Sequence, residues 1–391
     1  MWRGFKLISD DSHFEGSPDQ WRSYVPKEFQ AYMPRIVKLP NGGDAWETPG
    51  DPPTRMGLGL NLAMGRGWEN LKVSGISYDE PGIVGTGDGQ QRLLEMDRDG
   101  IDAEVIYTPV GRGFRTAPTE ASHAIAQAYN NWLSKEYCAP DPNRLLGLGM
   151  LPSGSVENAV AELKRIKGMP GIYGVHLHEW PAGGLGPSPE DDIFWQAAVE
   201  TGVPLTVHIR FGGGVEADRP RIDPTSGPMA PINTMLTKIA YPTAYCMTQL
   251  ITNRVFDRFP SLRISFAECG ASWVPFYAES ADTNYFRHRH WAQIALDHEP
   301  SHYIRRNFLF GMQDDYAAIK IRDLIGVDNL TWGTDFPHVA CDWPHSDRVL
   351  EKMFAGVPAE DIRKIVGGNL ARHLGLDPAK AAARPVPIAA E

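Results

Sequence analysis

Leu330-Thr331-Trp332-Gly333-Thr334-Asp335-Phe336-Pro337-His338 is the stretch of sequence that decides the fold. Its first residues predict a short buried strand, and a carboxylate follows where that strand ends. The proline stops the strand ladder, because it has no backbone N–H to donate, and it leaves a histidine within reach of the carboxylate. The stretch therefore predicts a strand that delivers a metal ligand at its carboxyl end.

Two earlier stretches repeat this arrangement. Gly202-Val203-Pro204-Leu205-Thr206-Val207-His208 runs an apolar strand into an imidazole, and the segment from Phe5 to His13 ends in Asp11-Ser12-His13. Each of these groups alone has an ordinary explanation, because a strand-end Asp often caps a helix and a strand-end His is often a hydrogen-bonded core residue. Three strands that each end in a metal ligand together indicate a catalytic metal site on a parallel barrel.

The rest of the chain alternates predicted strands and helices. In addition to the strands at residues 202–208 and before Asp335, we expect strands at residues 103–107, 145–150, 174–178, 263–268 and 308–310. We expect helices at residues 121–138, 156–166, 191–200, 231–252 and from Trp273. This repetition predicts the α/β class, specifically a TIM-type (β/α)8 barrel of the metal-dependent hydrolase type. A doubly wound open sheet competes with it, but no Gly-rich phosphate turn follows the first strand.

Composition narrows the possible partners. The chain has 391 residues, 42% of them hydrophobic, which suits one barrel domain over residues 1–391. A net charge of −10 without a basic run argues against nucleic acid, so we expect a small-molecule substrate. The four cysteines are far apart in sequence, so they suggest neither a disulfide framework nor a thiolate zinc site. We see no signal peptide or membrane-spanning stretch and expect a cytoplasmic protein.

Two stretches interrupt the alternation. Residues 33–89 are rich in Gly and Pro, and we interpret them as an irregular insertion after the first strand that lies over the catalytic mouth as a lid; a surface insertion is the alternative. Residues 284–306 contain Arg287-His288-Arg289-His290-Trp291, which we interpret as an amphipathic surface or subunit contact rather than a metal tract. Residues 376–391 form an expected C-terminal tail.

The sequence resembles the amidohydrolase-related family, in its aminocarboxymuconate-semialdehyde decarboxylase-like branch within the amidohydrolase superfamily. The resemblance covers nearly the whole chain and rests on these motifs: Ile8-Ser9-Asp10-Asp11-Ser12-His13 with Pro18-Asp19-Gln20-Trp21, Glu95-Met96-Asp97-Arg98-Asp99-Gly100-Ile101-Asp102, Tyr129-Asn130-Asn131-Trp132, Gly333-Thr334-Asp335-Phe336-Pro337-His338 and Gly368-Asn369-Leu370-Ala371-Arg372. Relatives often dimerise, so it implies a homodimer or higher homo-oligomer, and the helical segment near residues 231–252 could supply the interface. It does not name the reaction, since such proteins include decarboxylases, hydratases and hydrolases.

Two departures from the family pattern affect the site. Many relatives begin with His-x-His where this chain has Asp11-x-His13; the two side chains still share a face, and the harder oxygen donor makes manganese more plausible beside zinc. Relatives commonly have a histidine after the strand at 263–267, where this chain has Glu268. A carboxylate there would repel a carboxylate substrate, or act as a general base or metal ligand.

From these positions we expect one divalent metal ion, zinc or manganese, bound by Asp11, His13, His208 and Asp335. We expect Asp335 also to accept and return a proton, with Glu268 as a further catalytic group. His178 or His338 would stabilise developing negative charge. His176, on the same strand, is interpreted as an interior polar residue.

Arg112 and Arg115 could clamp a substrate carboxylate, or be solvated loop charges. The first expectation for the reaction is metal-dependent hydrolysis of a small, aromatic or carboxylate-bearing molecule by an activated water. The alternatives are non-oxidative decarboxylation of an aromatic acid and a catalytically silent barrel that binds a small molecule.

Overall fold

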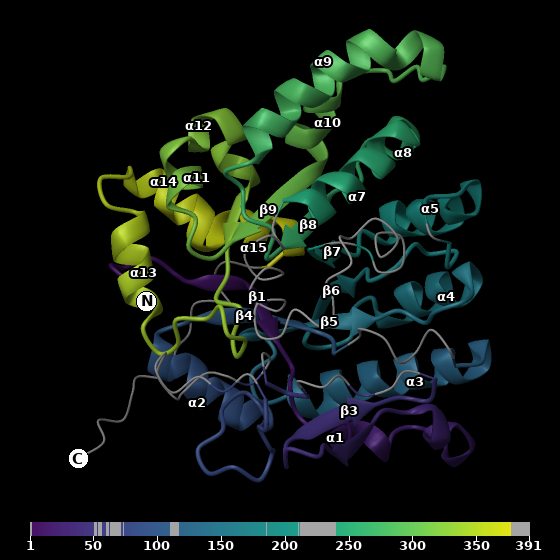
Figure 1. The fold of residues 1–391 in the computed structure, drawn as a ribbon, viewed down its shortest axis with the longest axis vertical. Coiled ribbons are helices and arrows are strands. Elements are labelled where there is room, and N and C mark those ends of the chain that lie inside the picture. The colour runs from purple at the N-terminus through teal and green to yellow at the C-terminus, as the bar shows by residue number, and fades with distance from the viewer. Residues whose placement is uncertain are drawn as a thin grey trace.

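The computed structural model describes residues 2–50, 53, 57–59, 62, 72, 74–109, 117–184, 186–209, 211 and 240–376. Eight parallel strands follow one another around the sheet in chain order: β1 (Ile8–His13), β4 (Ala103–Tyr107), β5 (Leu145–Met150), β6 (Ile172–His176), β7 (Leu205–His208), β8 (Ile264–Ala267), β9 (Phe308–Met312) and β10 (Leu330–Trp332). Helices surround this sheet (Figure 1). The predicted TIM-type (β/α)8 barrel is confirmed.

The helices that connect or cover the strands are α2 (Gly89–Asp99), α3 (Thr119–Trp132) with a π-helical continuation (Leu133–Tyr137), α4 (Val156–Ile166), α5 (Asp192–Thr201), α7 (Tyr241–Thr252), α8 (Val255–Arg258), α9 (Val274–Ala292), α10 (Pro300–Asn307), α11 (Tyr316–Lys320), α12 (Arg322–Ile325), α13 (Ser346–Met353), α14 (Ala359–Arg363), a π-helical turn (Lys364–Gly368) and α15 (Asn369–Leu374). Short helices also lie at α1 (Asp19–Arg22) and at Lys27–Tyr32, Pro189–Asp191 and Val327–Asn329.

Local sequence signals set the ends of several helices. Ser155 caps α4 by accepting a hydrogen bond from the Asn158 N–H, and Gly100 ends α2 in a left-handed conformation.

The barrel closes between its first and last strands. Past the end of β10, the Asp335 N–H donates to the Asp11 carbonyl at 2.9 Å and the His13 N–H donates to the Phe336 carbonyl at 2.8 Å. Gly333 allows this approach, because a Cβ there would lie 2.3 Å from Asp10 Oδ1 and 2.9 Å from the Asp11 nitrogen. The first and last strands of the barrel are therefore held together at the place where the predicted ligands lie.

The hydrophobic core lies mainly between the strands and the surrounding helices. Val175, Val207 and Phe266 from neighbouring strands are fully buried in one large cluster with Trp195 and Leu250 from α5 and α7. β1 differs, because its polar residues Ser9, Asp10, Asp11 and Ser12 are also buried. Burial of so many polar groups in one strand requires partners inside the barrel.

Three predicted boundaries differ from the structure. β6 covers Ile172–His176 rather than residues 174–178, and β10 ends at Trp332, three residues before Asp335. The insertion at 33–89 is not irregular throughout, because β2 (Arg35–Lys38) and β3 (Asp44–Glu47) pair as an antiparallel hairpin. Its later part reaches the barrel, where the Tyr78 hydroxyl donates to the Glu15 carbonyl at 3.0 Å. Residues 231–239 of the predicted helix and 377–391 of the tail lie outside the described residues.

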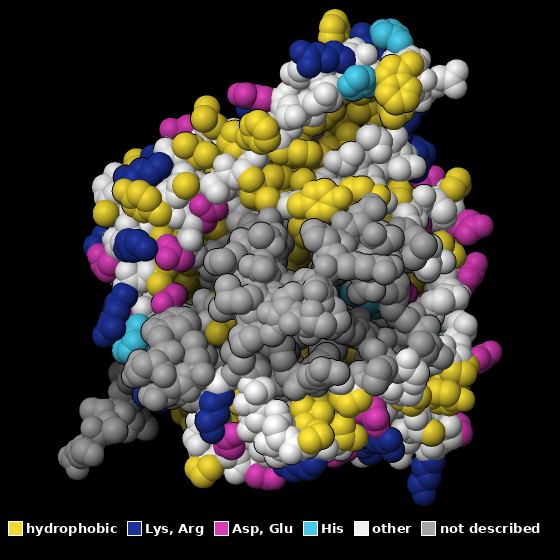
Figure 2. Space-filling model, viewed as in Figure 1, with side chains coloured by type: hydrophobic (Ala, Val, Ile, Leu, Met, Phe, Trp, Pro, Cys, Tyr) yellow, Lys and Arg dark blue, Asp and Glu magenta, His cyan; other side chains and the backbone are white. Residues whose placement is uncertain are grey.

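Helix α9 projects from the barrel, and hydrophobic side chains gather along this part of the surface (Figures 1 and 2). Phe276, Phe286 and Trp291 are 77%, 70% and 75% exposed. The Arg- and His-rich run at 287–291 lies in this helix and in none of the groups of described residues whose ligand atoms could hold a metal. Within the described part of the chain, no helix has both the length and the apolar character needed to cross a bilayer.

Candidate metal centre

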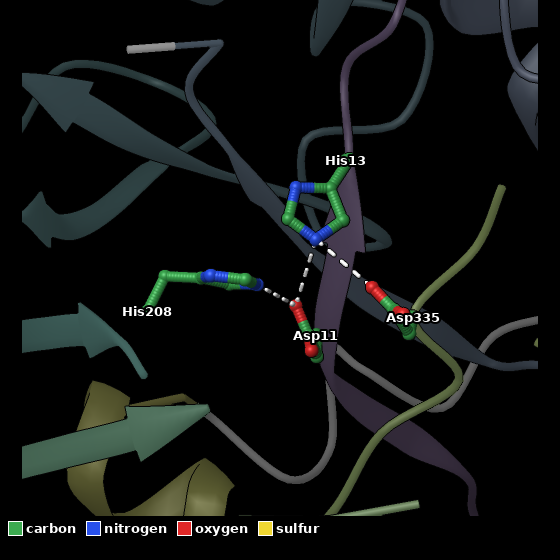
Figure 3. Close-up of side chains that lie close together, drawn as sticks. All are labelled: Asp11, His13, His208 and Asp335. Carbon is green, nitrogen blue, oxygen red and sulfur yellow. Dashed lines mark ion pairs between the residues drawn. The ribbon is translucent and has the colours of Figure 1, made fainter. Parts of the chain in front are cut away.

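Four side chains from three strand ends meet at one point (Figure 3). Asp11 and His13 lie in β1, His208 is the last residue of β7, and Asp335 follows β10. One ligand atom from each residue lies within 4.8 Å of those of the others. The carboxyl ends of parallel strands share one face of a barrel, which is why residues more than 300 positions apart in sequence come together.

The distances within this cluster are short. His13 Nε2 lies 3.2 Å from Asp11 Oδ1 and 3.1 Å from Asp335 Oδ1, and His208 Nε2 lies 3.6 Å from Asp11 Oδ1. Both oxygens of Asp11, both oxygens of Asp335, and Nε2 of both histidines are buried without a hydrogen-bond partner. Buried polar atoms without partners are costly, and a cation between them would satisfy them together. Two imidazoles and two carboxylates fit a divalent ion such as zinc or manganese.

The protonation states of Asp335 and His208 suit metal binding, whereas the pKa of His13, which burial alone would lower, is raised by Asp11 and Asp335. Burial alone would raise the pKa of Asp335, but contacts with His338 and His13 hold it well below its usual value. Burial, reinforced by His13, lowers the pKa of His208 well below its usual value. Burial and the neighbouring Asp335 raise the pKa of Asp11. An ionised Asp335 and a neutral His208 are the forms that bind metals, and the crowding of two carboxylates favours a cation.

The backbone around Asp335 is held by β1. The Thr334 N–H donates to the Ser9 hydroxyl at 2.9 Å, and the Ser9 hydroxyl donates to the Asp11 carbonyl at 2.8 Å. Asp335 itself has φ +57, in the left-handed region that non-glycine residues rarely adopt. Such strain persists where the surroundings determine the conformation, so the carboxylate position is set by this network.

His338 lies beside the cluster and brings in a residue that the sequence analysis missed. Its Nδ1 lies 3.0 Å from Asp335 Oδ1 and its Nε2 lies 3.0 Å from Glu15 Oε1. Burial alone would lower the pKa of His338, but Asp335 and Glu15 raise it well above its usual value. Glu15 stands two residues after His13, and this spacing was the signal available in the sequence. His13, Glu15 and His338 also form a second group whose ligand atoms lie within 4.8 Å of one another.

Glu268 faces the cluster from the neighbouring strand. It directly follows β8, is 4% exposed, and its Oε2 lies 3.3 Å from His208 Nε2. This position brings a further carboxylate beside the proposed metal ligands. The sequence alone had left open whether the Glu268 side chain would lie beside these ligands or face the outer helices.

His178 and His176 lie next to this cluster without joining it. His178 falls two residues past β6, its Nε2 is 3.4 Å from the Ser153 hydroxyl, and it is absent from both described groups of potential ligands. His176 Nδ1 lies 2.9 Å from the Thr108 hydroxyl, and burial lowers its pKa well below its usual value. His176 is thus buried and hydrogen-bonded, as the sequence analysis had interpreted it. Arg112 and Arg115 lie outside the described residues.

Asp10 is a second buried carboxyl group that the sequence analysis did not single out. It contacts the Thr331 hydroxyl, and burial raises its pKa to about 8. A Cβ on Gly311 or Gly333 would lie 2.4 Å or 2.3 Å from its oxygens, so these glycines provide its space. The glycines in β9 and after β10 were the available signal.

Comparisons with known proteins point to one family. The amidohydrolase family matches residues 85–376. A 2-amino-3-carboxymuconate-6-semialdehyde decarboxylase from Dictyostelium discoideum is 25% identical over 300 residues, which cover 75% of this chain and 78% of the relative.

Solved structures share the fold at lower identity. A 5-carboxyvanillate decarboxylase from Sphingomonas paucimobilis is 19% identical with a TM-score of 0.67, over 96% of this chain and 100% of that one. A dihydroxybenzoic acid decarboxylase from Polaromonas sp. JS666, solved with manganese and the inhibitor 2-nitroresorcinol, is 18% identical with a TM-score of 0.62, over 97% of this chain and 99% of that one. At these identities, the likeness shows that the fold is shared.

Proposed function

This chain belongs to the amidohydrolase family, and on that premise we propose that it is a metal-dependent decarboxylase of aromatic or similar unsaturated carboxylic acids. The observation that carries the proposal is the cluster of Asp11, His13, His208 and Asp335, whose buried ligand atoms lack hydrogen-bond partners. The names of the relatives support the reaction, since the curated relative and both solved structures described above are decarboxylases.

We assign the four clustered residues as ligands of one divalent ion. Manganese is favoured over zinc, because carboxylate oxygens make a hard donor set and one related structure contains manganese. The ion would supply positive charge that draws the substrate carboxylate and a neighbouring oxygen into the site. His13 and His208 would keep neutral nitrogens toward it, and the Ser9 hydroxyl, which accepts a hydrogen bond from the Thr334 N–H, would hold the loop that carries Asp335.

Decarboxylation requires one proton for the carbon that loses its carboxylate. The bond from that carbon to the carboxylate breaks, carbon dioxide leaves, and the electron pair on the carbon takes up the proton. We assign proton delivery to the pair of Asp335 and His338, whose Oδ1 and Nδ1 atoms are 3.0 Å apart. Water would return the proton to the pair. His178, near the site, is proposed to contact the substrate, and Arg112 and Arg115 are proposed to bind its distal acidic group.

Hydrolysis is the second candidate, and Glu268 is the observation that favours it. A buried carboxylate at 3.3 Å from His208 would oppose an anionic substrate group, whereas it could hold an attacking water. We still rank decarboxylation first, because the relatives are decarboxylases. A bound cation would also reduce the repulsion between Glu268 and an anionic substrate group.

The test uses the full chain loaded with manganese or zinc and offered 5-carboxyvanillate, dihydroxybenzoates and 2-amino-3-carboxymuconate-6-semialdehyde in deuterium oxide. We expect carbon dioxide release in equal amount to substrate consumed, with deuterium at the vacated position. Turnover of ester or amide substrates without carbon dioxide release from any acid would instead favour hydrolysis.

The assembly and location also stay proposals. We propose a homodimer or higher homo-oligomer in the cytoplasm, and light scattering after size-exclusion chromatography tests the assembly. We also propose that the insertion at 33–89 acts as a lid, because its residue Tyr78 bonds to Glu15 and Gly85 packs against Pro337.

A further inference from the structure

Glu268 occupies a position directly beside a proposed metal ligand. β7 and β8 are paired so that His208 lies opposite Ala267, and Glu268 is the next residue. The backbone is fixed here, because the Ile209 N–H donates to the Ala267 carbonyl at 3.0 Å. The Glu268 carboxylate therefore reaches His208 from the end of the neighbouring strand, where the pairing of β7 and β8 holds the backbone.

The distance between the two side chains fits shared coordination better than a hydrogen bond. Glu268 Oε2 lies 3.3 Å from His208 Nε2, which is within the 3.1 to 3.6 Å range of the other contacts in the cluster. Two donors that each lie about 2.1 Å from one ion at right or tetrahedral angles are roughly 3.0–3.4 Å apart. His208 Nε2 makes no hydrogen bond in spite of this proximity. The same nitrogen also lies 3.6 Å from Asp11 Oδ1, so both carboxylates lie beside His208, although only Asp11 belongs to the group whose ligand atoms all lie within 4.8 Å of one another.

The backbone of Glu268 matches that of Asp335. Glu268 has φ +52 and Asp335 has φ +57, and each follows a barrel strand closely. Non-glycine residues rarely adopt this conformation, and it gathers at sites where function positions a side chain. Glu268 beside His208 and Asp335 beside His13 thus share one uncommon backbone conformation, which is consistent with a common role.

We propose that Glu268 is a fifth ligand of the metal ion, a role that rests on the metal site of the proposed function. The donor set is then two imidazoles and three carboxylates, which is harder than the set of four and selects manganese over zinc. Coordination also draws the negative charge of Glu268 toward the cation. This reduces the conflict between Glu268 and a carboxylate substrate.

The experiment measures metal affinity of the metal-free full chain. Free manganese is followed by its electron paramagnetic resonance signal, and zinc by competition with a chromophoric chelator. Loss of an outer-shell partner lowers metal affinity about 10- to 100-fold, so Glu268→Gln should weaken manganese binding by about 100-fold or more. Glu268→His should shift the preference toward zinc, because imidazole is a softer donor than carboxylate.

Glu162→Gln is the matched control. Glu162 is also fully buried, but it bonds to Asn130 and Arg165 on the helical side of the barrel. This variant should bind both metals as the native chain does. Circular dichroism of each metal-free variant checks that the fold is retained.

The outcomes separate this proposal from the proposed function. Native affinity in Glu268→Gln, with loss of metal in Asp335→Asn, would overturn the role of Glu268 and leave the metal site intact. Failure of the native chain to bind either metal would overturn both. If the Glu268 variants do not fold, a crystal structure of the manganese-loaded native chain decides, and a Glu268 oxygen more than about 3 Å from the ion would contradict coordination.

Discussion

The imidazole of His338 lies flat against that of His13, with ring centroids 3.8 Å apart and 14° between the ring planes. His338 also contacts Asp335 on one side and Glu15 on the other. One residue outside the cluster thus touches two of its members. We infer that Glu15 holds His338, and that His338 in turn orients His13 and Asp335.

Replacing Glu15 should therefore weaken metal binding without removing a proposed ligand of the main site. We expect Glu15→Gln to lower manganese affinity about 10- to 100-fold, the usual effect of losing a partner of a metal ligand. Isothermal titration calorimetry measures it. Glu136→Gln is the control, because Glu136 also accepts a hydrogen bond, from Tyr24, but far from the site. Equal affinities in both variants and the native chain would exclude this positioning role.

Changes in the cluster itself should remove the ion. We expect Asp335→Asn and His208→Ala to lose bound metal and activity, because the first removes the negative charge of a proposed donor and the second removes a proposed donor. The fold should persist, since the core lies between strands and helices. Elemental analysis and circular dichroism measure these two results. Asp314→Asn, which changes an exposed partner of Lys352, should keep its metal. Full metal content in both cluster variants would show that the ion binds elsewhere.

Arg92 links the end of β1 to the segment that follows β10. Its side chain is 1% exposed, pairs with Glu104 at 2.7 Å, and donates to the carbonyls of His13 and Phe336. Arg92→Met leaves Glu104 buried without its cation, so the free energy of unfolding should fall by about 3–5 kcal/mol. Urea unfolding of the metal-free chain measures the change. Arg363→Met removes an exposed pair with Glu360 and should have little effect. A similar small effect of Arg92→Met would contradict the prediction.

His373 predicts a pH dependence of stability away from the metal. Burial, helped by Arg263, lowers its pKa to about 4, below the ordinary value near 6.5. The unfolded chain therefore binds more protons between these values, and stability should fall as the pH drops from about 6.5 to 4. His373→Gln should reduce this loss. Melting temperatures of both chains across the range test it, and parallel curves would assign the loss to other groups.

The sequence predicted which four side chains come together better than it predicted the boundaries of the strands. Asp11, His13, His208 and Asp335 could be found because the carboxyl ends of parallel strands must lie on one face. The predicted start of β6, Gly174, is two residues later than its observed start at Ile172. In the structure Gly174 lies inside the strand, where a Cβ would come 2.8 Å from the Pro204 carbonyl oxygen. A glycine inside a strand often marks such a close approach of another backbone.

Contacts that depend on loops were not predictable. Glu15 was missed because its contact with His338 depends on how the chain turns after β1 and after Asp335. The hairpin of β2 and β3 had a local signal, since Asn41-Gly42 is typical of hairpin turns, but the surrounding Gly and Pro residues concealed it. The side of the barrel that Glu268 faces was open for the same reason, because it lies just past the end of its strand.

The closure of the barrel between β1 and β10 divides the metal site between distant parts of the chain. Asp11 and His13 are synthesised early, whereas Asp335 follows more than 300 residues later. A growing chain therefore lacks one of the four proposed donors, Asp335, until the last strand is made and docks beside the first. Metal uptake would then report that barrel closure is complete, and partly folded chains would bind metal only weakly.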